Sequence, residues 1–286
     1  MRYLPICLDA SDLPCLIVGG GEVAARKLVW LQRAGARITL VAPARCEALS
    51  GRDDFCYIEA AFAPAHLEDQ RLVIAATNRL EVNTAVADAC RARGIPVNVV
   101  DTPSLCSFIV PAVVDRSPLT ISISTGCAAP VLATRLRAQI EALVPAESAA
   151  LTAFMGEQRA AVKARHPSPG ARRRFWQGFL DSGIPRLLQQ DPTAVAPAFA
   201  ALLAADLDGA LAPRESILEL SSLRPGDLTL DGLGLLSDAD RLIYSPEVPA
   251  AIRNYARRDA EVLTLPAGDV APPAPGHTVY VRLRAG

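Results

Sequence analysis

The sequence lacks a continuous run of about 18 apolar residues, although 51% of its 286 residues are hydrophobic. Its opening segment carries Asp9 where a secretory signal would need an unbroken apolar core. The formal net charge is −1, which gives no general attraction toward nucleic acid or an anionic membrane. We therefore expect a globular, cytoplasmic protein with neither a nucleic-acid nor a membrane partner.

Histidine is scarce, with three copies far apart, and no two cysteines have the CxxC spacing. These two features exclude preassembled zinc sites of the common spacings. The seven cysteines are scattered and odd in number. That distribution argues against a disulfide framework and for reduced thiols that are mostly small core residues.

Residues 14–111 contain a regular alternation of short β-rich runs and helical stretches. Leu28 and Leu31 lie on the apolar side of the first helix. Strands that alternate with helices predict a parallel sheet covered on both faces. The fold class is therefore α/β, with a doubly wound, Rossmann-like domain over residues 1–113. We expect strands at 15–18, 37–42, 72–76 and 97–100, and helices at 23–34 and 83–93.

Three further regions are expected after this domain. Residues 114–146 combine an alternating strand at 119–124 with a helix from Pro130, and form a small α+β region suited to dimerisation. Residues 147–212 carry helical patterns, and residues 213–286 regain βα character with a Pro/Ala/Gly-rich loop at 266–275. The apolar stripe of the helix from Pro130 consists of Leu132, Leu136, Ile140 and Leu143.

Gly19, Gly20 and Gly21 stand directly after an expected strand and directly before an expected helix. In the spacing Gly19-x-Gly21-x-x-Ala24, the first glycine permits a tight turn and the second lets a pyrophosphate touch the backbone. The small Ala24 brings the helix close to the sheet, so that its N-terminus faces the phosphates. The strand–turn–helix context favours a dinucleotide site over a merely structural glycine turn.

The acid that usually binds the adenosine ribose is missing from the end of the second strand, where residues 41–44 read VAPA. Arg45 is nearby and would favour a 2′-phosphate, so this loop leaves NAD and NADP both open. Thr77 and Asn78 follow the third strand at the edge where cofactors lie. A helix-capping turn is an equally good interpretation of these two residues.

Asp101 follows the fourth strand and is expected at the carboxyl edge of the sheet, where it would face a nicotinamide. An acid after a strand is more often a turn or cap residue than a catalytic one. The surrounding residues 98–111 (NVVDTPSLCSFIVP) are the most informative stretch of the chain.

With this stretch, the chain resembles the precorrin-2 dehydrogenase/sirohydrochlorin ferrochelatase family, in particular the amino-terminal half of fused siroheme synthases. The matching segments run in order along the chain: CLIVGGGEVAARK (15–27), AGARITLVAP (34–43), AATN (75–78), NVVDTPSLCSFIVPAVVDRSPLTISISTG (98–126), PVLATRLR (130–137) and RRRFW (172–176).

The resemblance implies NAD-dependent oxidation of precorrin-2 to sirohydrochlorin, followed in many members by insertion of ferrous iron, in a homodimer. It implies that Asp101 is the acid–base group of both steps and touches the metal transiently. Dinucleotide contacts carry over, largely through backbone atoms, to Glu22, Val23, Pro43 and Ala44, which favours NAD. Thr125 replaces a serine that can be phosphorylated in the fused enzymes.

A tetrapyrrole edged with carboxylates should meet several arginines. By resemblance, residues 147–212 are the helical tetrapyrrole-binding domain. A solvated surface side chain is the commoner role for each arginine taken singly. The predicted substrate contacts are Ser107, Arg116, Arg135, Arg137, Arg172, Arg173 and Arg174.

Residues 213–286 resemble a degenerate remnant of the uroporphyrinogen methyltransferase domain that follows in the fused enzymes. The expected glycine loop reads Ser221-Ser222-Leu223-Arg224, and the acid expected after Tyr244 is Ser245. We therefore expect no methyl transfer. Two alternatives to the bifunctional enzyme stay open, namely a dehydrogenase without chelatase activity and a non-catalytic nucleotide-sensing module.

Overall fold

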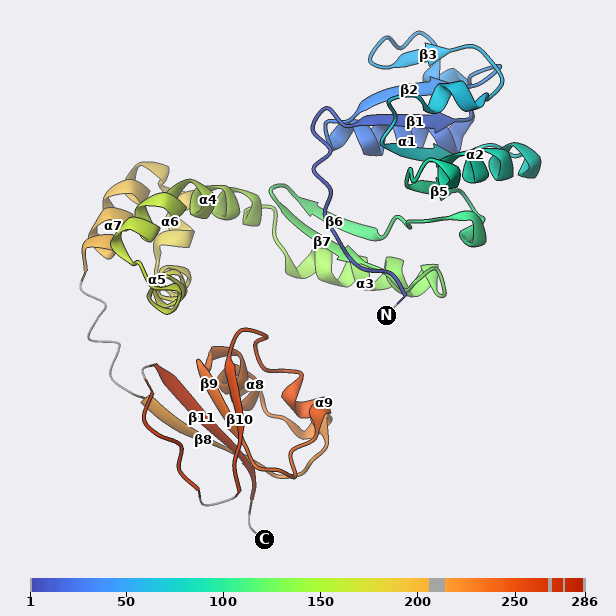
Figure 1. Cartoon of the computed structure of the whole chain (residues 1–286). Coiled ribbons are helices and arrows are strands. Elements are labelled where there is room, and N and C mark those ends of the chain that lie inside the picture. The colour runs from blue at the N-terminus through green and yellow to red at the C-terminus, as the bar shows by residue number, and fades with distance from the viewer. Residues whose placement is uncertain (1, 206–213, 267–268, 275, 285–286) are drawn as a thin grey trace. The chain divides into compact units, whose positions relative to one another are not determined.

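The computed structural model describes residues 2–205, 214–266, 269–274 and 276–284 (Figure 1). The chain divides into two compact units, Met1–Ser148 and Ala149–Gly286, which are described separately here. None of the described helices is both long and apolar enough to cross a membrane.

The first unit contains a five-stranded parallel sheet in the order β3-β2-β1-β4-β5. The chain first moves outward from β1 to β3 and then returns to build β4 and β5 on the other side of β1. The carboxyl ends of β1 and β4 therefore flank the topological switch point, where open α/β sheets bind their ligands. The strands are β1 (Pro14–Val18), β2 (Arg37–Val41), β3 (Cys56–Ile58), β4 (Leu72–Ala75) and β5 (Val97–Val99).

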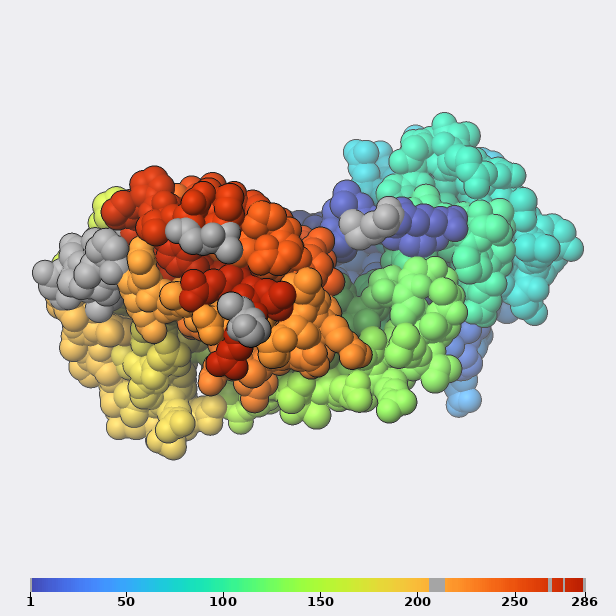
Figure 2. Space-filling view, turned by 90° about the horizontal axis from the view of Figure 1, so that it is seen from below, coloured from blue at the N-terminus to red at the C-terminus, as the bar shows by residue number. Residues whose placement is uncertain are grey.

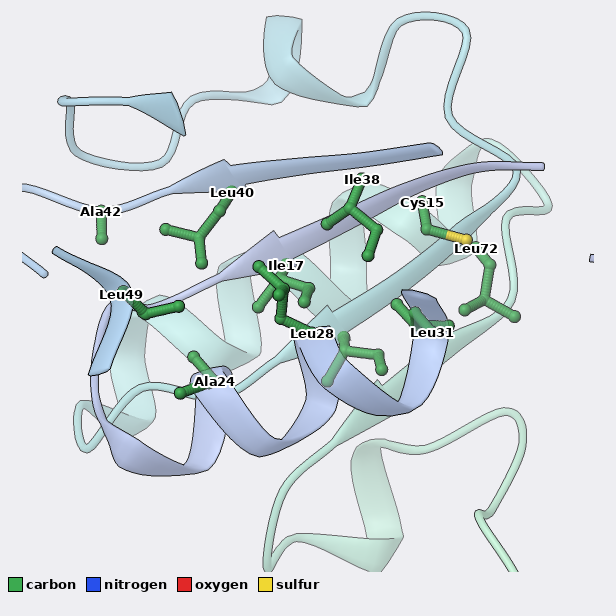
Figure 3. Close-up of a cluster of buried hydrophobic side chains, with 12 residues drawn as sticks. Cys15, Ile17, Ala24, Leu28, Leu31, Ile38, Leu40, Ala42, Leu49 and Leu72 are labelled. Atoms are coloured by element: carbon green, nitrogen blue, oxygen red, sulfur yellow. The ribbon is translucent and has the colours of Figure 1, made fainter. Parts of the chain in front are cut away.

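Alternating residues of β1 enter two different hydrophobic clusters, because successive strand side chains point to opposite faces. Ile17 packs with Leu28 and Leu31 of helix α1 (Glu22–Arg33) on one face (Figure 3). Leu16 packs on the other face with Val86 of helix α2 (Leu80–Ala92). The sheet is thus covered on both sides, which confirms the predicted doubly wound α/β class.

Two elements of the first unit were not expected from the sequence. Strand β3 has three residues at the edge of the sheet, too few for a readable alternation. Strand β6 (Ala112–Arg116) pairs antiparallel with β7 (Leu119–Ile123), so the alternating run at 119–124 is one arm of a hairpin. Helix α2 also begins at Leu80, three residues before the expected start.

Helix α3 (Pro130–Leu143) follows the hairpin and begins at the expected proline. Its expected apolar stripe is not buried within the chain, since Leu132 is 49% exposed and Leu143 is 79% exposed. Only Ala133 of this helix is buried. Exposed leucines on a helix face leave a surface that a partner can cover.

The second unit begins with a helical part whose core is aromatic. Phe175 and Phe179 each pack edge to face against Phe199, with ring centres 5.7 and 5.9 Å apart. Pro169, Pro192 and the capping residue Ser168 mark helix starts in the usual way. The helices are α4 (Ser148–Arg165), α5 (Pro169–Asp181), α6 (Ile184–Gln190) and α7 (Pro192–Ala204).

A second parallel sheet, in the order β10-β9-β11-β8, forms the rest of this unit. Leu236 of helix α8 packs against the sheet residues Leu242 and Val279. The boundary expected between residues 212 and 213 lies outside the described residues, and the four-region division stays a prediction. The elements are β8 (Arg214–Leu220), α8 (Leu230–Asp238), β9 (Arg241–Tyr244), α9 (Ala250–Arg253), β10 (Glu261–Thr264) and β11 (His277–Leu283).

Candidate functional site

The turn between β1 and α1 consists of bare backbone at the switch point. Gly19 has φ +124°, and a Cβ on it would lie 2.5 Å from the carbonyl oxygen of Ala76. A Cβ on Gly20 would lie 2.0 Å from the carbonyl oxygen of Ala44. A Cβ on Gly21 would instead meet no atom within 4 Å, so this glycine leaves open space in front of the N-terminus of α1. That space and the helix N-terminus fit a pyrophosphate.

Glu22 and Val23 form the first turn of α1, and Ala24 is fully buried beneath it. Pro43 and Ala44 belong to the loop after β2 that presses on Gly20, and the amide of Cys46 donates to the carbonyl of Gly20 at 2.7 Å. The structure therefore brings the predicted cofactor residues of the first two strands to one edge of the sheet.

Thr77 and Asn78 begin the turn after β4, which packs against Gly19. The Thr77 hydroxyl donates to Oδ1 of Asn83 at 2.7 Å, and Nδ2 of Asn83 donates to the carbonyl of Thr77 at 3.0 Å. Asn83 is only 4% exposed. Thr77 thus holds the turn together with its side chain, and its amide nitrogen lies against Gly19, whereas Asn78 is exposed.

Asp101 lies just beyond β5 at the same edge, exposed and in the left-handed region with φ 56°. Aspartate tolerates this conformation better than most residues. The amide of Val100 donates to the carbonyl of Ala75 at 2.9 Å, which fixes the Asp101 segment beside the turn that follows β4. The carboxylate therefore stands at the carboxyl end of the sheet, as predicted, and is not tied down by a described side-chain hydrogen bond.

Cys106 and Ser107 anchor the loop that carries Asp101 to the backbone of β5. The amide of Val99 donates to Sγ of Cys106 at 3.1 Å. The amide of Val97 donates to the hydroxyl of Ser107 at 2.8 Å. The Ser107 hydroxyl thus bonds the backbone of β5, while its predicted contact with substrate stays a prediction.

Lys27 of α1, which ends the matching segment CLIVGGGEVAARK, is a half-buried cation that the sequence pattern does not single out. Burial lowers the pKa of the Lys27 ammonium, Arg26 lowers it further, and the carboxylate of Asp101 opposes both effects. The interaction places an ammonium group within electrostatic reach of Asp101. The half-buried lysine thus connects the glycine-turn helix with the acid.

The predicted arginines fall into several different environments. Arg116 bonds the Glu141 carboxylate at 3.3 Å and the Val144 carbonyl at 3.2 Å, and Arg137 pairs with the same Glu141. These contacts support packing roles. Arg135, on the exposed side of α3, has no ion pair among the described residues.

The other three arginines belong to α5, in the second unit. Arg172 bonds the carbonyls of His166 and Pro167, and Arg173 pairs with Asp240. Arg174 has no ion pair within the described part of the chain. Thr125, the candidate for modification, accepts a hydrogen bond at 3.2 Å from the amide of Ala129, the residue that precedes α3. The described residues contain no group of three or more His, Cys, Asp and Glu side chains that could hold a metal.

Comparison with known families matches three models in succession along the chain. Residues 6–112 match "Putative NAD(P)-binding", residues 116–143 match "Sirohaem biosynthesis protein central", and residues 147–203 match "Sirohaem synthase dimerisation region". Two of these three models are named for sirohaem synthesis. This confirms the resemblance read from the sequence. The family model named for dimerisation matches residues 147–203, whereas the sequence predicts a dimerisation region at 114–146.

Individual relatives give the same result. The chain is 40% identical over 270 residues to the siroheme synthase of Nitrosospira multiformis, covering 91% of this chain and 57% of that protein. It is 44% identical over 268 residues to the siroheme synthase of Methylococcus capsulatus, covering 91% and 56%. The chain therefore spans little more than half the length of these relatives. Because the matches cover 91% of the chain, they necessarily extend into residues 213–286.

A solved structure, "SirC, precorrin-2 dehydrogenase", shares the fold with a TM-score of 0.58 at 21% identity. It covers 70% of this chain and 100% of its own. Together with the family match of residues 6–112, the glycine turn identifies a nicotinamide dinucleotide as the class of cofactor.

Proposed function

We propose that this chain oxidises precorrin-2 to sirohydrochlorin with NAD, in siroheme synthesis. The observation that carries the proposal is the exposed carboxylate of Asp101 at the same sheet edge as the open space in front of Gly21. A nucleotide sensor has no need of an acid at this position. The similarity to siroheme synthases over 91% of the chain supplies the substrate class.

NAD, when bound, accepts a hydride. The loss of a hydride from the macrocycle leaves a proton to be removed, and the carboxylate of Asp101 is placed to accept it. Among the predicted arginines, Arg135 and Arg174 make no ion pair in the described part of the chain, so their guanidinium donors are free for substrate carboxylates.

The test is Asp101→Asn, which keeps the side-chain shape and the tolerance of positive φ but removes the acid. NADH formation from precorrin-2 should fall by about 10²–10⁴-fold, with NAD affinity unchanged within twofold. Asp69→Asn is the matched control, because Asp69 is also exposed and has φ 61° but lies before β4 at the opposite edge of the sheet. A normal rate in the Asp101 variant would remove the catalytic assignment.

We also propose that the same site inserts ferrous iron into sirohydrochlorin, with iron as substrate. Insertion requires removal of pyrrole protons, which an exposed carboxylate can accept while it contacts the cation. Sirohydrochlorin and ferrous iron, mixed with the protein without NAD, should give the siroheme spectrum faster than the uncatalysed reaction. An unaccelerated rate would leave the dehydrogenase alone.

We propose that the chain acts as a cytoplasmic homodimer and that an exposed apolar surface of the first unit contributes to it. The N-terminal segment runs beside the hairpin and α3 (Figures 1 and 2), and the ring of Tyr3 lies near Gly126. Val131→Asp should weaken the dimer measured by analytical ultracentrifugation. Val270→Asp, on an equally exposed valine of the second unit, should not. The large exposed side chains of this surface are Leu4, Ile6, Leu8, Val131, Leu132 and Leu143.

Residues 213–286 are proposed to be a methyltransferase remnant without activity. The matches to fused relatives extend into this segment, and its sheet is parallel like that of a ligand-binding α/β domain. Modification of Thr125 stays a prediction.

A further inference from the structure

Arg45 is a positioned cation without a counter-charge. It follows the end of β2, and its guanidinium carbon lies 4.5 Å from the centre of the Tyr57 ring. Within the described part of the chain it makes no hydrogen bond and no ion pair. Arg52 of the same sheet region differs, because the carboxylate of Asp54 engages it at 2.6 Å. The donors of Arg45 are therefore free to meet an anion.

The aromatic platform beneath Arg45 is fixed. Tyr57 belongs to β3, and its hydroxyl donates to the carbonyl of Ala42 at 3.0 Å. A guanidinium stacked on a tyrosine ring is attracted by the negative face of the ring and loses freedom of movement. The cation is thus held in place before any ligand binds.

The loop that carries Arg45 is anchored to the glycine turn on both sides of this residue. The Ala44 carbonyl touches Gly20, and the amide of Cys46 donates to the carbonyl of Gly20 at 2.7 Å. The end of β2 is the position from which Rossmann-like domains reach the adenosine ribose. An acid there would bind the 2′-hydroxyl and repel a 2′-phosphate, but residues 41–44 contain none.

We propose that Arg45, held on Tyr57, binds the 2′-phosphate of a phosphorylated dinucleotide, so that this chain takes NADP as well as NAD. The proposal rests on the nicotinamide dinucleotide site at Gly19–Gly21. It makes Arg45 the residue that sets the choice between the two cofactors, through charge-assisted hydrogen bonds to the phosphate. The contacts of NAD, made through the backbone of the same loop, do not depend on it.

The test uses fragments of the cofactor, so it needs no tetrapyrrole. Calorimetric titration should show that wild-type protein binds adenosine 2′,5′-bisphosphate about ten- to a hundredfold more tightly than adenosine 5′-monophosphate. Arg45→Ala should abolish this preference and leave the affinity for the 5′-monophosphate within twofold. Arg37→Ala is the matched control, because it removes the same charge from the opposite end of β2 and should change neither affinity.

A second pair of variants tests the platform. Tyr57→Leu removes the ring and should lower the preference for the 2′-phosphate several-fold, whereas Tyr57→Phe keeps the ring and should retain most of it. Equal affinity of the wild type for both fragments would overturn the proposal. So would an equal loss for both fragments in Arg45→Ala, because it would indicate a general attraction of anions. Binding of neither fragment would instead contradict the dinucleotide site itself.

Discussion

The chain contains two parallel sheets, and the turn after the first strand of each is built from different residue types. After β1 the turn consists of Gly19–Gly21 and leaves open space in front of α1. After β8 the corresponding residues are Ser221-Ser222-Leu223-Arg224. There the hydroxyl of Ser222 donates to the carboxylate of Asp227 at 2.6 Å and accepts from the amide of Arg224 at 3.0 Å. The polar groups of the second turn therefore form hydrogen bonds within the turn. Its side chains also occupy positions where a ligand would need bare backbone.

The two sheets also differ in the residue that follows a strand at the carboxyl edge. The first sheet presents the exposed carboxylate of Asp101 beyond β5. The second sheet has Ser245 beyond β9, 5% exposed, with its amide bonded to the carbonyl of Val281 at 3.0 Å. Parallel topology is therefore common to both sheets, whereas a glycine turn followed by an exposed acid at the carboxyl edge is described in the first. Fold alone does not confer the function.

The largest effect is expected from Gly21→Val, which puts a side chain into the open space of the first turn. Gly21 has φ −89°, an ordinary value, and no atom lies within 4 Å of its added Cβ. Folding should be unaffected, while NAD affinity should fall about a hundredfold or more, because the pyrophosphate cannot reach the backbone. Isothermal titration together with thermal unfolding separates the two quantities. Unchanged affinity would contradict the placement of the phosphates.

A smaller effect, on stability, is expected from Gly20→Ala. The added Cβ would meet the Ala44 carbonyl oxygen at 2.0 Å, so the loop after β2 must shift, at a cost of about 1–3 kcal/mol. Urea unfolding of the first unit measures it. In the second unit, Gly234 of α8 has no atom within 4 Å of an added Cβ. Gly234→Ala should therefore stabilise the protein by about 0.5–1 kcal/mol. Similar effects of the two variants would show that the first turn is not tightly packed.

The cysteines offer a probe of the first sheet alone, because all seven precede residue 128. Burial raises the pKa values of the Cys15 and Cys90 thiols to about 11. Only the thiolate reacts, so both residues should resist Ellman's reagent at pH 8 in the folded protein, while the exposed Cys7, Cys56 and Cys127 react. Their protection also adds to stability below about pH 9, and that contribution should be lost as the pH rises toward about 11. Rapid modification of all seven thiols would contradict the buried core.

The sequence predicted the first sheet well, because its central strands are fully buried hydrophobic runs and its glycines sit between a strand and a helix. It missed β3 and β6, which are a short edge strand and one arm of a hairpin with little alternation. It located Asp101 but not the electrostatic interaction of Lys27 with this acid, since nothing local relates a lysine on α1 to a residue after β5. The partners of Arg116 and Arg173 are distant in sequence, so only the tertiary structure could reveal them.

No effect on methyl transfer is expected from variants that rebuild a glycine turn after β8. Replacing Ser222 and Leu223 together by glycine frees backbone after β8 but supplies no acid after β9, where Ser245 is buried. Neither this double variant nor its combination with Ser245→Asp should transfer methyl groups to uroporphyrinogen, measured with radiolabelled S-adenosylmethionine. The combination should also be less stable, because a buried unpaired carboxylate is costly. Methyl transfer by any of these proteins, the wild type included, would show that the second sheet retains a working site. The proposed difference in function between the two sheets would then be wrong.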